Sequence, residues 1–343
     1  MRMRNGVVAM AVGLVMAATL TGATTAPRGT ATRATAWGGA RPCSPYVSIQ
    51  RFSDALDKTE FHGSYVGNLS ALVAEDGGRV AALSDRSELF TLGRGHRPES
   101  VVPLADEKGG RLDSEGLVAF RGGTYLVSSE TEPSVRRYDR DGTLMERLPV
   151  PDELLLAPDG RGRVNETFEG LTLSADGRTL IAAMEGPLID EPTDEQGREV
   201  VRFQTWRQDS GGSFALGRQY RYPVDKGLKV PELSSLKDGR LLVLERGYTA
   251  GEGNTIRLYL ADPGHASATR PMPKALLADL GSCPSLGATH PQPGANPLLD
   301  NVEGIAVVGR APGGRLRLLL VSDDNHSPKQ VTRLYELSAR LPR

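Results

Sequence analysis

The chain has 343 residues, of which 24% are charged, and a formal net charge of −1. Nearly balanced charge gives no reason to expect nucleic acid or an anionic membrane surface as partner. The 40 glycines and 23 prolines are typical of a chain with short strands and many turns, and the length fits one large repeat domain.

The chain begins with a segment typical of a secretory signal. Two arginines precede an apolar stretch, residues 6–20, which is short for a membrane span, and an Ala-Thr-Ala cleavage site ends at residue 36. We predict removal of residues 1–36 and secretion of residues 37–343 as a single domain; an uncleaved anchor is the alternative. The mature chain then carries 37 basic and 42 acidic groups, and no other stretch is apolar enough for a membrane.

A strand-like segment at 46–52 is followed by a phrase that recurs every fifty to seventy residues. Its five copies are Leu69-Ser70-Ala71-Leu72, Glu115-Gly116-Leu117, Glu169-Gly170-Leu171, Leu233-Ser234-Ser235-Leu236 and Glu303-Gly304-Ile305. Each is followed by a polar turn and an apolar run that ends on an acid: Asp85, Glu130, Glu185, Glu245 and Asp323. Such a unit predicts an all-β protein, a β-propeller with five legible blades and five or six in total.

The last unit is one strand short. We predict that the strand at 46–52 completes it by pairing with residues 332–337, which closes the ring and leaves no open sheet edge. A sixth blade could lie within 187–231 or 262–300. Residues 186–199 are rich in Pro, Asp and Glu, and residues 281–300 are rich in Gly and Pro. Both compositions predict long loops, which we expect on one rim of the ring.

The only cysteines are Cys43 and Cys283. In an exported protein, a single pair most simply forms one disulfide. Ring closure would bring the loops that carry them together, so we predict that bond; two unpaired buried thiols are the alternative.

The repeated acids suggest a metal site. Because inner strands line the channel, and antiparallel neighbours place one strand's start beside the next strand's end, the acids should share one mouth. Crowded carboxylates repel each other unless a cation lies between them, and oxygen ligands without His or Cys suit Ca²⁺. The predicted ligands are Glu115, Glu169, Glu303, Asp85, Glu130 and Asp323, with Glu232 as a possible addition. Alternatively, the acids pair with basic groups or cap turns.

Four basic groups stand next to these acids and are the candidate catalytic residues: Arg86, Arg246, His326 and Lys329. Beside Ca²⁺ they could clamp a phosphate and stabilise the charge that develops as its ester is split. Each could instead be exposed or structurally paired. No nucleophile elbow, zinc-ligand spacing, phosphate-binding loop or dinucleotide fingerprint accompanies them.

Several phrases, in order over residues 65–338, resemble the secreted phytase-like family, described as having esterase-like activity of phytase. They are Ser84-Asp85-Arg86, Asp113-Ser114-Glu115-Gly116, Ser128-Ser129-Glu130, Asn165-Glu166-Thr167-Phe168-Glu169-Gly170, Glu245-Arg246-Gly247-Tyr248, Asp300-Asn301-Val302-Glu303-Gly304 and Ser322-Asp323-Asp324-Asn325. The long His- and Asp-containing motif of alkaline propeller phytases has no counterpart here.

The resemblance implies an exported bacterial propeller that hydrolyses phosphoesters or related esters. With the acids, it predicts a Ca²⁺-dependent hydrolase that is secreted, monomeric and active on a small-molecule ester or phosphoester. The alternatives are a non-catalytic propeller that binds a ligand or protein at the cell envelope, and a lactonase-like propeller with one deep metal. Arg, Lys and His converging on an open cleft would favour hydrolysis; an apolar or aromatic rim patch would favour binding.

Overall fold

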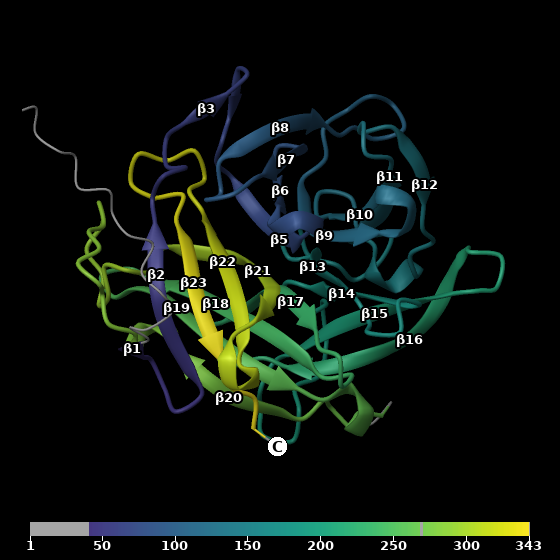
Figure 1. Ribbon diagram of the computed structural model, residues 1–343. Coiled ribbons are helices and arrows are strands. Elements are labelled where there is room, and N and C mark those ends of the chain that lie inside the picture. Colours follow the sequence, from purple (N-terminus) through teal and green to yellow (C-terminus); the bar gives the residue numbers. More distant parts are fainter. Residues whose placement is uncertain (1–40, 268–269, 343) are drawn as a thin grey trace, which may run out of the picture. The chain divides into compact units, whose positions relative to one another are not determined.

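The computed structural model describes residues 41–267 and 270–342; the predicted signal, residues 1–36, lies outside them. The described residues form five antiparallel sheets of at least four strands each, and these are the blades of a propeller (Figure 1). Within these ranges no helix is long and apolar enough to cross a bilayer.

The blades follow each other along the chain. The first contains β5 (Leu69–Ala74), β6 (Val80–Ser84), β7 (Glu88–Leu92) and β8 (Pro98–Pro103), and the second β9 (Ser114–Phe120), β10 (Thr124–Ser129), β11 (Ser134–Tyr138) and β12 (Leu144–Arg147). The third contains β13 (Phe168–Leu173), β14 (Thr179–Met184), β15 (Val200–Gln208) and β16 (Phe214–Pro223). The fourth contains β17 (Lys229–Ser235), β18 (Leu241–Thr249), β19 (Gly253–Ala261) and β20 (Lys274–Asp279).

The fifth blade joins the two ends of the described chain. It contains β21 (Asn301–Arg310), β22 (Leu316–Asp323), β23 (Leu334–Ala339), β2 (Val47–Ser53) and β1 (Arg41–Pro42). β2 pairs antiparallel with β23, from Val47 opposite Ala339 to Ser53 opposite Leu334, and Figure 1 shows the two side by side. The predicted closure is therefore confirmed, and the described residues of both segments considered for a sixth blade belong to the third and fourth blades or to loops.

Smaller elements decorate the ring. β3 (Glu60–Phe61) and β4 (Ser64–Tyr65) form a hairpin between β2 and the first blade. Short 3₁₀ turns lie at Asp76–Gly78, Arg121–Gly123, Asp152–Leu154, Pro263–His265, Leu280–Ser282 and Pro312–Gly314. A disulfide joins Cys43 to Cys283, with 4.1 Å between their Cα atoms, so the predicted bond is confirmed.

The inner strands of neighbouring blades approach each other closely, which explains the recurring Glu-Gly pair. A Cβ atom at Gly116 would lie 2.5 Å from the carbonyl oxygen of Glu169, and one at Gly170 would lie 2.7 Å from Cα of Glu232. Side chains larger than hydrogen would therefore push the blades apart. Ser128 bridges the same seam, because its hydroxyl donates to the Glu169 carbonyl at 2.6 Å and accepts from the Gly116 amide at 2.7 Å.

Apolar side chains fill the space between blades. Trp206 is fully buried in a cluster drawn from the second, third and fourth blades, and its ring meets that of Phe168 edge to face at 5.7 Å. Its indole NH donates to the Pro149 carbonyl at 2.6 Å, so the one polar atom of the ring is satisfied. Burying a large side chain of this kind stabilises the fold by roughly 1.5–3 kcal/mol.

Candidate functional site

The acids at the channel mouth are placed by a bulge in each inner strand. The pairing of every inner strand with its neighbour shifts register near its start. A bulge inserts an extra residue and changes the direction of its side chain. The bulges contain Glu115 in β9, Glu169 in β13 and Glu303 in β21, whereas the first blade has Ser70 and the fourth has Val230 and Pro231.

Two groups of three carboxylates meet there. Asp113, Glu115 and Glu130 each offer an oxygen, and these atoms lie within 4.8 Å of one another. Glu130, Glu169 and Glu185 do the same, so Glu130 is common to both groups. Thr167 orients this shared residue, because its backbone amide donates to Glu130 Oε1 at 3.2 Å. We call the five carboxylate residues of the two groups the acid cluster: Asp113, Glu115, Glu130, Glu169 and Glu185.

Four of the five residues of the acid cluster are buried and Asp113 is half-buried, and the electrostatics of the cluster follow from that. Glu115, Glu130, Glu169 and Glu185 are each less than 9% exposed. Burial raises the pKa of Glu130 to about 8, and the charges of Glu185 and Asp113 add to the shift. Burial likewise raises the pKa of Glu115 and that of Glu169 well above their usual range, again with neighbouring carboxylates adding to it. In the absence of a cation, protons are therefore held on this cluster near neutral pH.

Two cations neutralise one side of the mouth. Lys229 Nζ lies 3.0 Å from Glu185 Oε2 and 3.1 Å from Glu166 Oε1. Arg246 Nη2 lies 3.2 Å from Glu185 Oε1 and 3.0 Å from Glu303 Oε1. Both cations contact the side that carries Glu185, and neither forms an ion pair with Glu115, Glu130 or Glu169.

The remaining predicted ligands border the acid cluster. Asp323 is buried, which raises its pKa well above its usual range, and the charge of Glu303 adds to that shift. Burial also raises the pKa of Asp85 to about 6; Asp85 Oδ2 accepts from Asn68 Nδ2 at 3.2 Å. Glu303 accepts from Asn301 as well as from Arg246, so its charge is already shared. Burial raises the pKa of Glu303 to about 7 despite that guanidinium.

Two acids grouped with these by the sequence lie elsewhere. Glu245 is buried between the third and fourth blades, where it accepts from Lys274 at 2.5 Å and Tyr222 at 2.7 Å. Glu232 points into the channel itself, a cavity of about 230 Å³ lined by all five inner strands. Its Oε1 accepts from the amides of Leu171 and Leu233 at 2.9 Å. The expectation that Glu232 and Glu245 extend the acid set is therefore wrong.

The candidate basic residues separate into three environments. Arg246 lies in the mouth, and Lys329 lines a neighbouring cavity. Arg86 is exposed and its guanidinium has no hydrogen bond or ion pair with the described residues. His326 is also exposed, and its ring packs edge-on against Tyr65 at 4.3 Å. Arg86 and Arg246 are not equivalent positions, because Arg246 pairs with Lys229 just before the bulge, where the first blade has Ser84 opposite Leu69.

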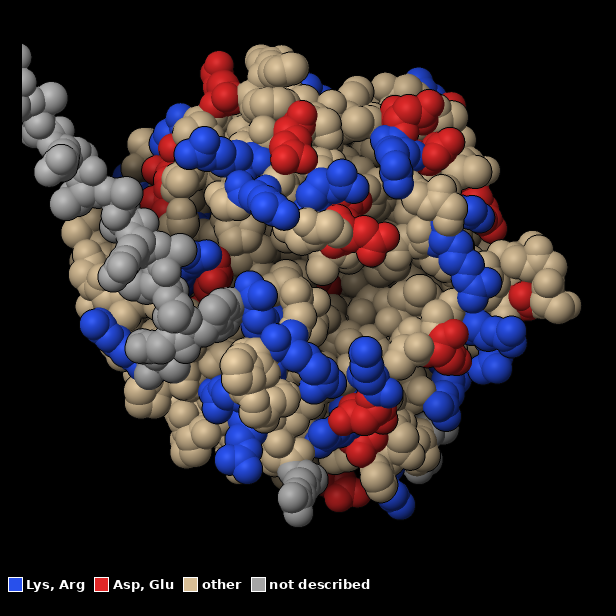
Figure 2. All heavy atoms as spheres, viewed as in Figure 1, with Lys and Arg blue, Asp and Glu red and all other residues tan. Residues whose placement is uncertain are grey.

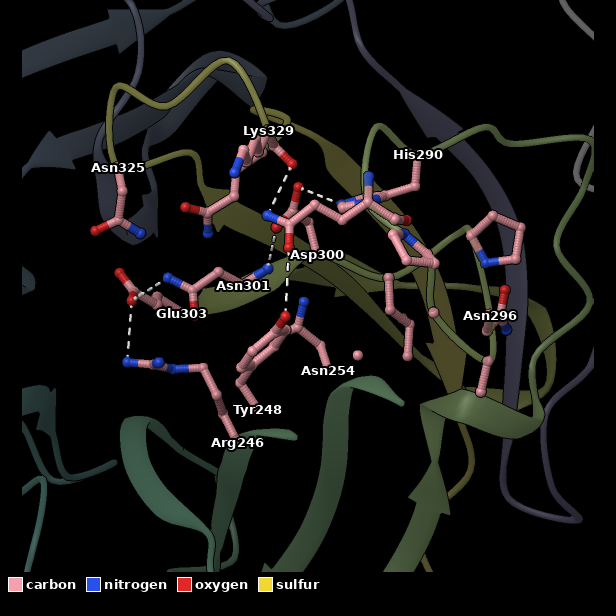
Figure 3. A pocket seen from close by; sticks show the side chains of 18 residues that line it. Arg246, Tyr248, Asn254, His290, Asn296, Asp300, Asn301, Glu303, Asn325 and Lys329 are labelled. Atoms are coloured by element: carbon pink, nitrogen blue, oxygen red, sulfur yellow. Dashed lines mark hydrogen bonds and ion pairs between the residues drawn. The ribbon is translucent and has the colours of Figure 1, made fainter. Parts of the chain in front are cut away.

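The cavity beside the mouth, of about 520 Å³, was not predicted (Figure 3). Arg246 and Glu303 form the wall that it shares with the mouth, and the loop before β21 forms the opposite wall. In that loop His290 Nε2 lies 2.8 Å from Asp300 Oδ2, and its Nδ1 lies 3.0 Å from the Gln292 amide. The sequence predicts a long rim loop at 281–300, but no motif in it singles out His290. Figure 2 shows one face of the molecule, hollowed at its centre, with basic and acidic side chains around the hollow.

The acid cluster suits a hard divalent cation. It consists of carboxylates alone, four of its five residues are buried, and the oxygens of each group lie within 4.8 Å of one another, a span that one ion can bridge. Ca²⁺ takes six to eight oxygen ligands at roughly 2.3–2.6 Å, and a cation would offset both the burial of these charges and the repulsion between them, which together raise the pKa values. The residues present therefore fit Ca²⁺.

The fold and this acidic mouth define the class: a β-propeller with carboxylates gathered at one end of its channel. The chain belongs to the phytase-like family described as having esterase-like activity of phytase, whose model matches residues 64–326.

A named relative and several solved structures are also similar. An "Uncharacterized secreted protein" from Arthroderma benhamiae is 32% identical over a match that covers 24% of this chain and 22% of its own, so the chain matches about a fifth of that relative. Glutaminyl cyclase from Myxococcus xanthus is 14% identical with a TM-score of 0.44, covering 86% of this chain and 97% of its own. A gluconolactonase from Xanthomonas campestris is 12% identical with a TM-score of 0.42, and the match covers 81% of this chain and 74% of that one.

Proposed function

We propose that this protein is a secreted, Ca²⁺-dependent hydrolase of phosphoesters or related esters. The observation that carries the proposal is the pair of buried carboxylate groups that share Glu130, next to Arg246 and to an open cavity. Family membership supports an ester as substrate, and the disulfide and the secreted relative support export.

Each group has a distinct part in this proposal. Asp113, Glu115, Glu130, Glu169 and Glu185 would hold the cation. A bound Ca²⁺ would act as a Lewis acid that polarises the ester and offsets developing negative charge. Arg246 is held by two carboxylates, and its buried Nε–H has no acceptor among the described residues. The side chain of Arg246 is 20% exposed and lines the open cavity, so its guanidinium can meet a substrate oxygen there, and charge-assisted hydrogen bonds of this kind position and stabilise a phosphate.

The neighbouring cavity favours hydrolysis over simple binding. It brings together Arg246, Lys329 and His290 beside the acids, whereas a binding module would offer an apolar or aromatic patch. Tyr248, 59% exposed, is the one aromatic residue of its lining.

The test is a screen of the mature protein against phosphate and carboxylate esters, after removal of divalent ions and again with Ca²⁺. We expect turnover with Ca²⁺, its loss on chelation, and at least a tenfold fall in kcat in Glu130→Gln. Glu252→Gln is the matched control, since Glu252 is exposed on a turn. Absence of turnover on every ester with Ca²⁺ present, or turnover indifferent to chelation, would reject the proposal.

A further inference from the structure

The cavity beside the channel mouth has a lining whose chemistry narrows the ligand it accepts. Its volume, about 520 Å³, is in the range typical of small-molecule sites. It shares Arg246 and Glu303 with the mouth, so a molecule whose ester group lies at the acid cluster can extend into it. What the remainder of that molecule must look like depends on which lining groups still have unused hydrogen-bonding capacity.

The acids of this cavity are already engaged. Asp300 is fully buried, and its Oδ2 accepts from the Val331 amide at 2.5 Å and faces His290 Nε2 at 2.8 Å. Its Oδ1 accepts from the Asn301 amide at 2.7 Å. Glu303 Oε1 is likewise held by Arg246 and by the Asn301 side chain, as the dashed lines of Figure 3 show. These acids fix the walls of the cavity rather than face a ligand.

The basic groups of the cavity also differ in whether they already have partners. Arg246 divides its charge between Glu185 and Glu303, and both ring nitrogens of His290 have partners. Lys329 is exposed, and its ammonium forms no hydrogen bond or ion pair with the described residues. One uncommitted positive charge therefore borders the cavity.

The other uncommitted groups are carboxamides. Asn254, at the start of β19, and Asn325 and Gln330, in the loop between β22 and β23, line the cavity and make no side-chain hydrogen bond with the described residues. Each carboxamide offers both donors and an acceptor. They contrast with Asn296, whose side-chain amide already donates hydrogen bonds to the carbonyls of Gly281 and Cys283.

We propose that this cavity binds the hydroxyl-rich part of the substrate and selects a molecule with one negative charge there. Hydroxyl groups donate and accept, so they match the three carboxamides, and one anionic group matches Lys329. A second anionic group would lie beside Glu303 and Asp300 with no further uncommitted cation, which disfavours polyanions. This inference rests on the proposed function for the orientation of the ester, but its test does not require turnover.

The test measures binding by calorimetry at fixed Ca²⁺ for three probes: glucose, glucose 6-sulfate and a glucose disulfate. Sulfate esters carry one charge each and bind Ca²⁺ weakly. We expect the monosulfate to bind about fivefold more tightly than glucose, the gain typical of one partly exposed ion pair, and the disulfate to bind no more tightly than the monosulfate. Equal binding of glucose and monosulfate, or tightest binding of the disulfate, would overturn the charge selection.

Two variants separate charge from hydroxyl recognition. Lys329→Gln should bring the monosulfate down to the affinity of glucose and leave glucose unchanged, whereas Asn254→Ala should weaken both by at least threefold. Lys237→Gln is the control for a lysine outside the cavity. Unchanged affinities in both cavity variants would overturn the site. If the probes bind as expected and no ester is hydrolysed, the proposed function fails and this inference stands. If esters are hydrolysed but the three probes bind equally, the proposed function stands and this inference fails.

Discussion

Lys229 and Arg246 face each other across β17 and β18, and both cations contact the carboxylate of Glu185. Glu185 is 5% exposed, so the two bases neutralise a charge that water does not solvate well. The fourth blade thus contributes positive charge at the level where the second, third and fifth blades contribute acids. Arg246 extends this compensation to Glu303, which joins the fourth blade to the fifth.

Replacing Arg246 by Met should destabilise the fold. The change keeps much of the side-chain volume but leaves Glu303 without its cation, and Glu185 with Lys229 alone. We expect the free energy of unfolding at pH 7.5 to fall by about 3 kcal/mol, near the low end for a broken buried pair because Arg246 is 20% exposed. Urea unfolding measures it. Arg86→Met should stay within about 0.5 kcal/mol, and equal losses in the two variants would contradict this account.

The sequence predicted the ring because its signals are local. A Glu-Gly pair marks an inner strand, since the acid occupies the bulge and glycine allows the next blade to approach. Ring closure was predicted on a different ground. The last blade lacked one strand, and an unpaired edge strand is costly, so another segment had to complete the sheet.

The fourth blade shows where such reasoning fails. Its phrase at 233–236 was aligned with the one at 69–72, but the bulge lies earlier, at Val230 and Pro231. On β18 this misalignment amounts to two residues: it equates Glu245 with Asp85 and Arg246 with Arg86, whereas the strand pairing places Arg246 at the position of Ser84. The cavity could not be predicted either, because His290 and Asp300 meet through a loop with no repeat to align.

Removing the disulfide should weaken ring closure. The Cys43–Cys283 bond spans 240 residues, and cross-links over loops of that length restrict the unfolded chain strongly. Since β2 and β23 already close the ring, we expect the Cys43→Ser, Cys283→Ser double variant to lose about 2–5 kcal/mol and still to fold. Denaturant unfolding with and without reductant measures the loss. If reductant destabilises the double variant as much as the parent protein, another effect is responsible.

Stability without a cation should fall as pH rises. Glu130, Glu303 and Asp85 have pKa values of about 8, 7 and 6 in the fold, above those of the unfolded chain. Between about pH 4.5 and 8 the folded state therefore binds more protons, and its stability decreases by up to about 1.4 kcal/mol per pH unit for each group in its window. The thermal midpoint in chelator should decline from pH 5 to 8, less steeply in Glu130→Gln. A midpoint that rises over this range would contradict the raised pKa values.

Calcium should reverse that loss, and Glu130 is the residue that tests it best. An ion that binds the deprotonated acid cluster replaces the protons and stabilises only the folded state, by about 2.7 kcal/mol at a concentration of 100 times its Kd. For a domain of this size the thermal midpoint should rise by several degrees at pH 7.5. Glu130→Gln removes an oxygen anion from both carboxylate groups and should abolish most of the rise. Glu303→Gln, outside both groups, should retain more of it, and Glu252→Gln all of it. If protein stripped by a chelator melts at the same temperature with and without Ca²⁺, the carboxylates are a protonated structural cluster and no calcium site exists.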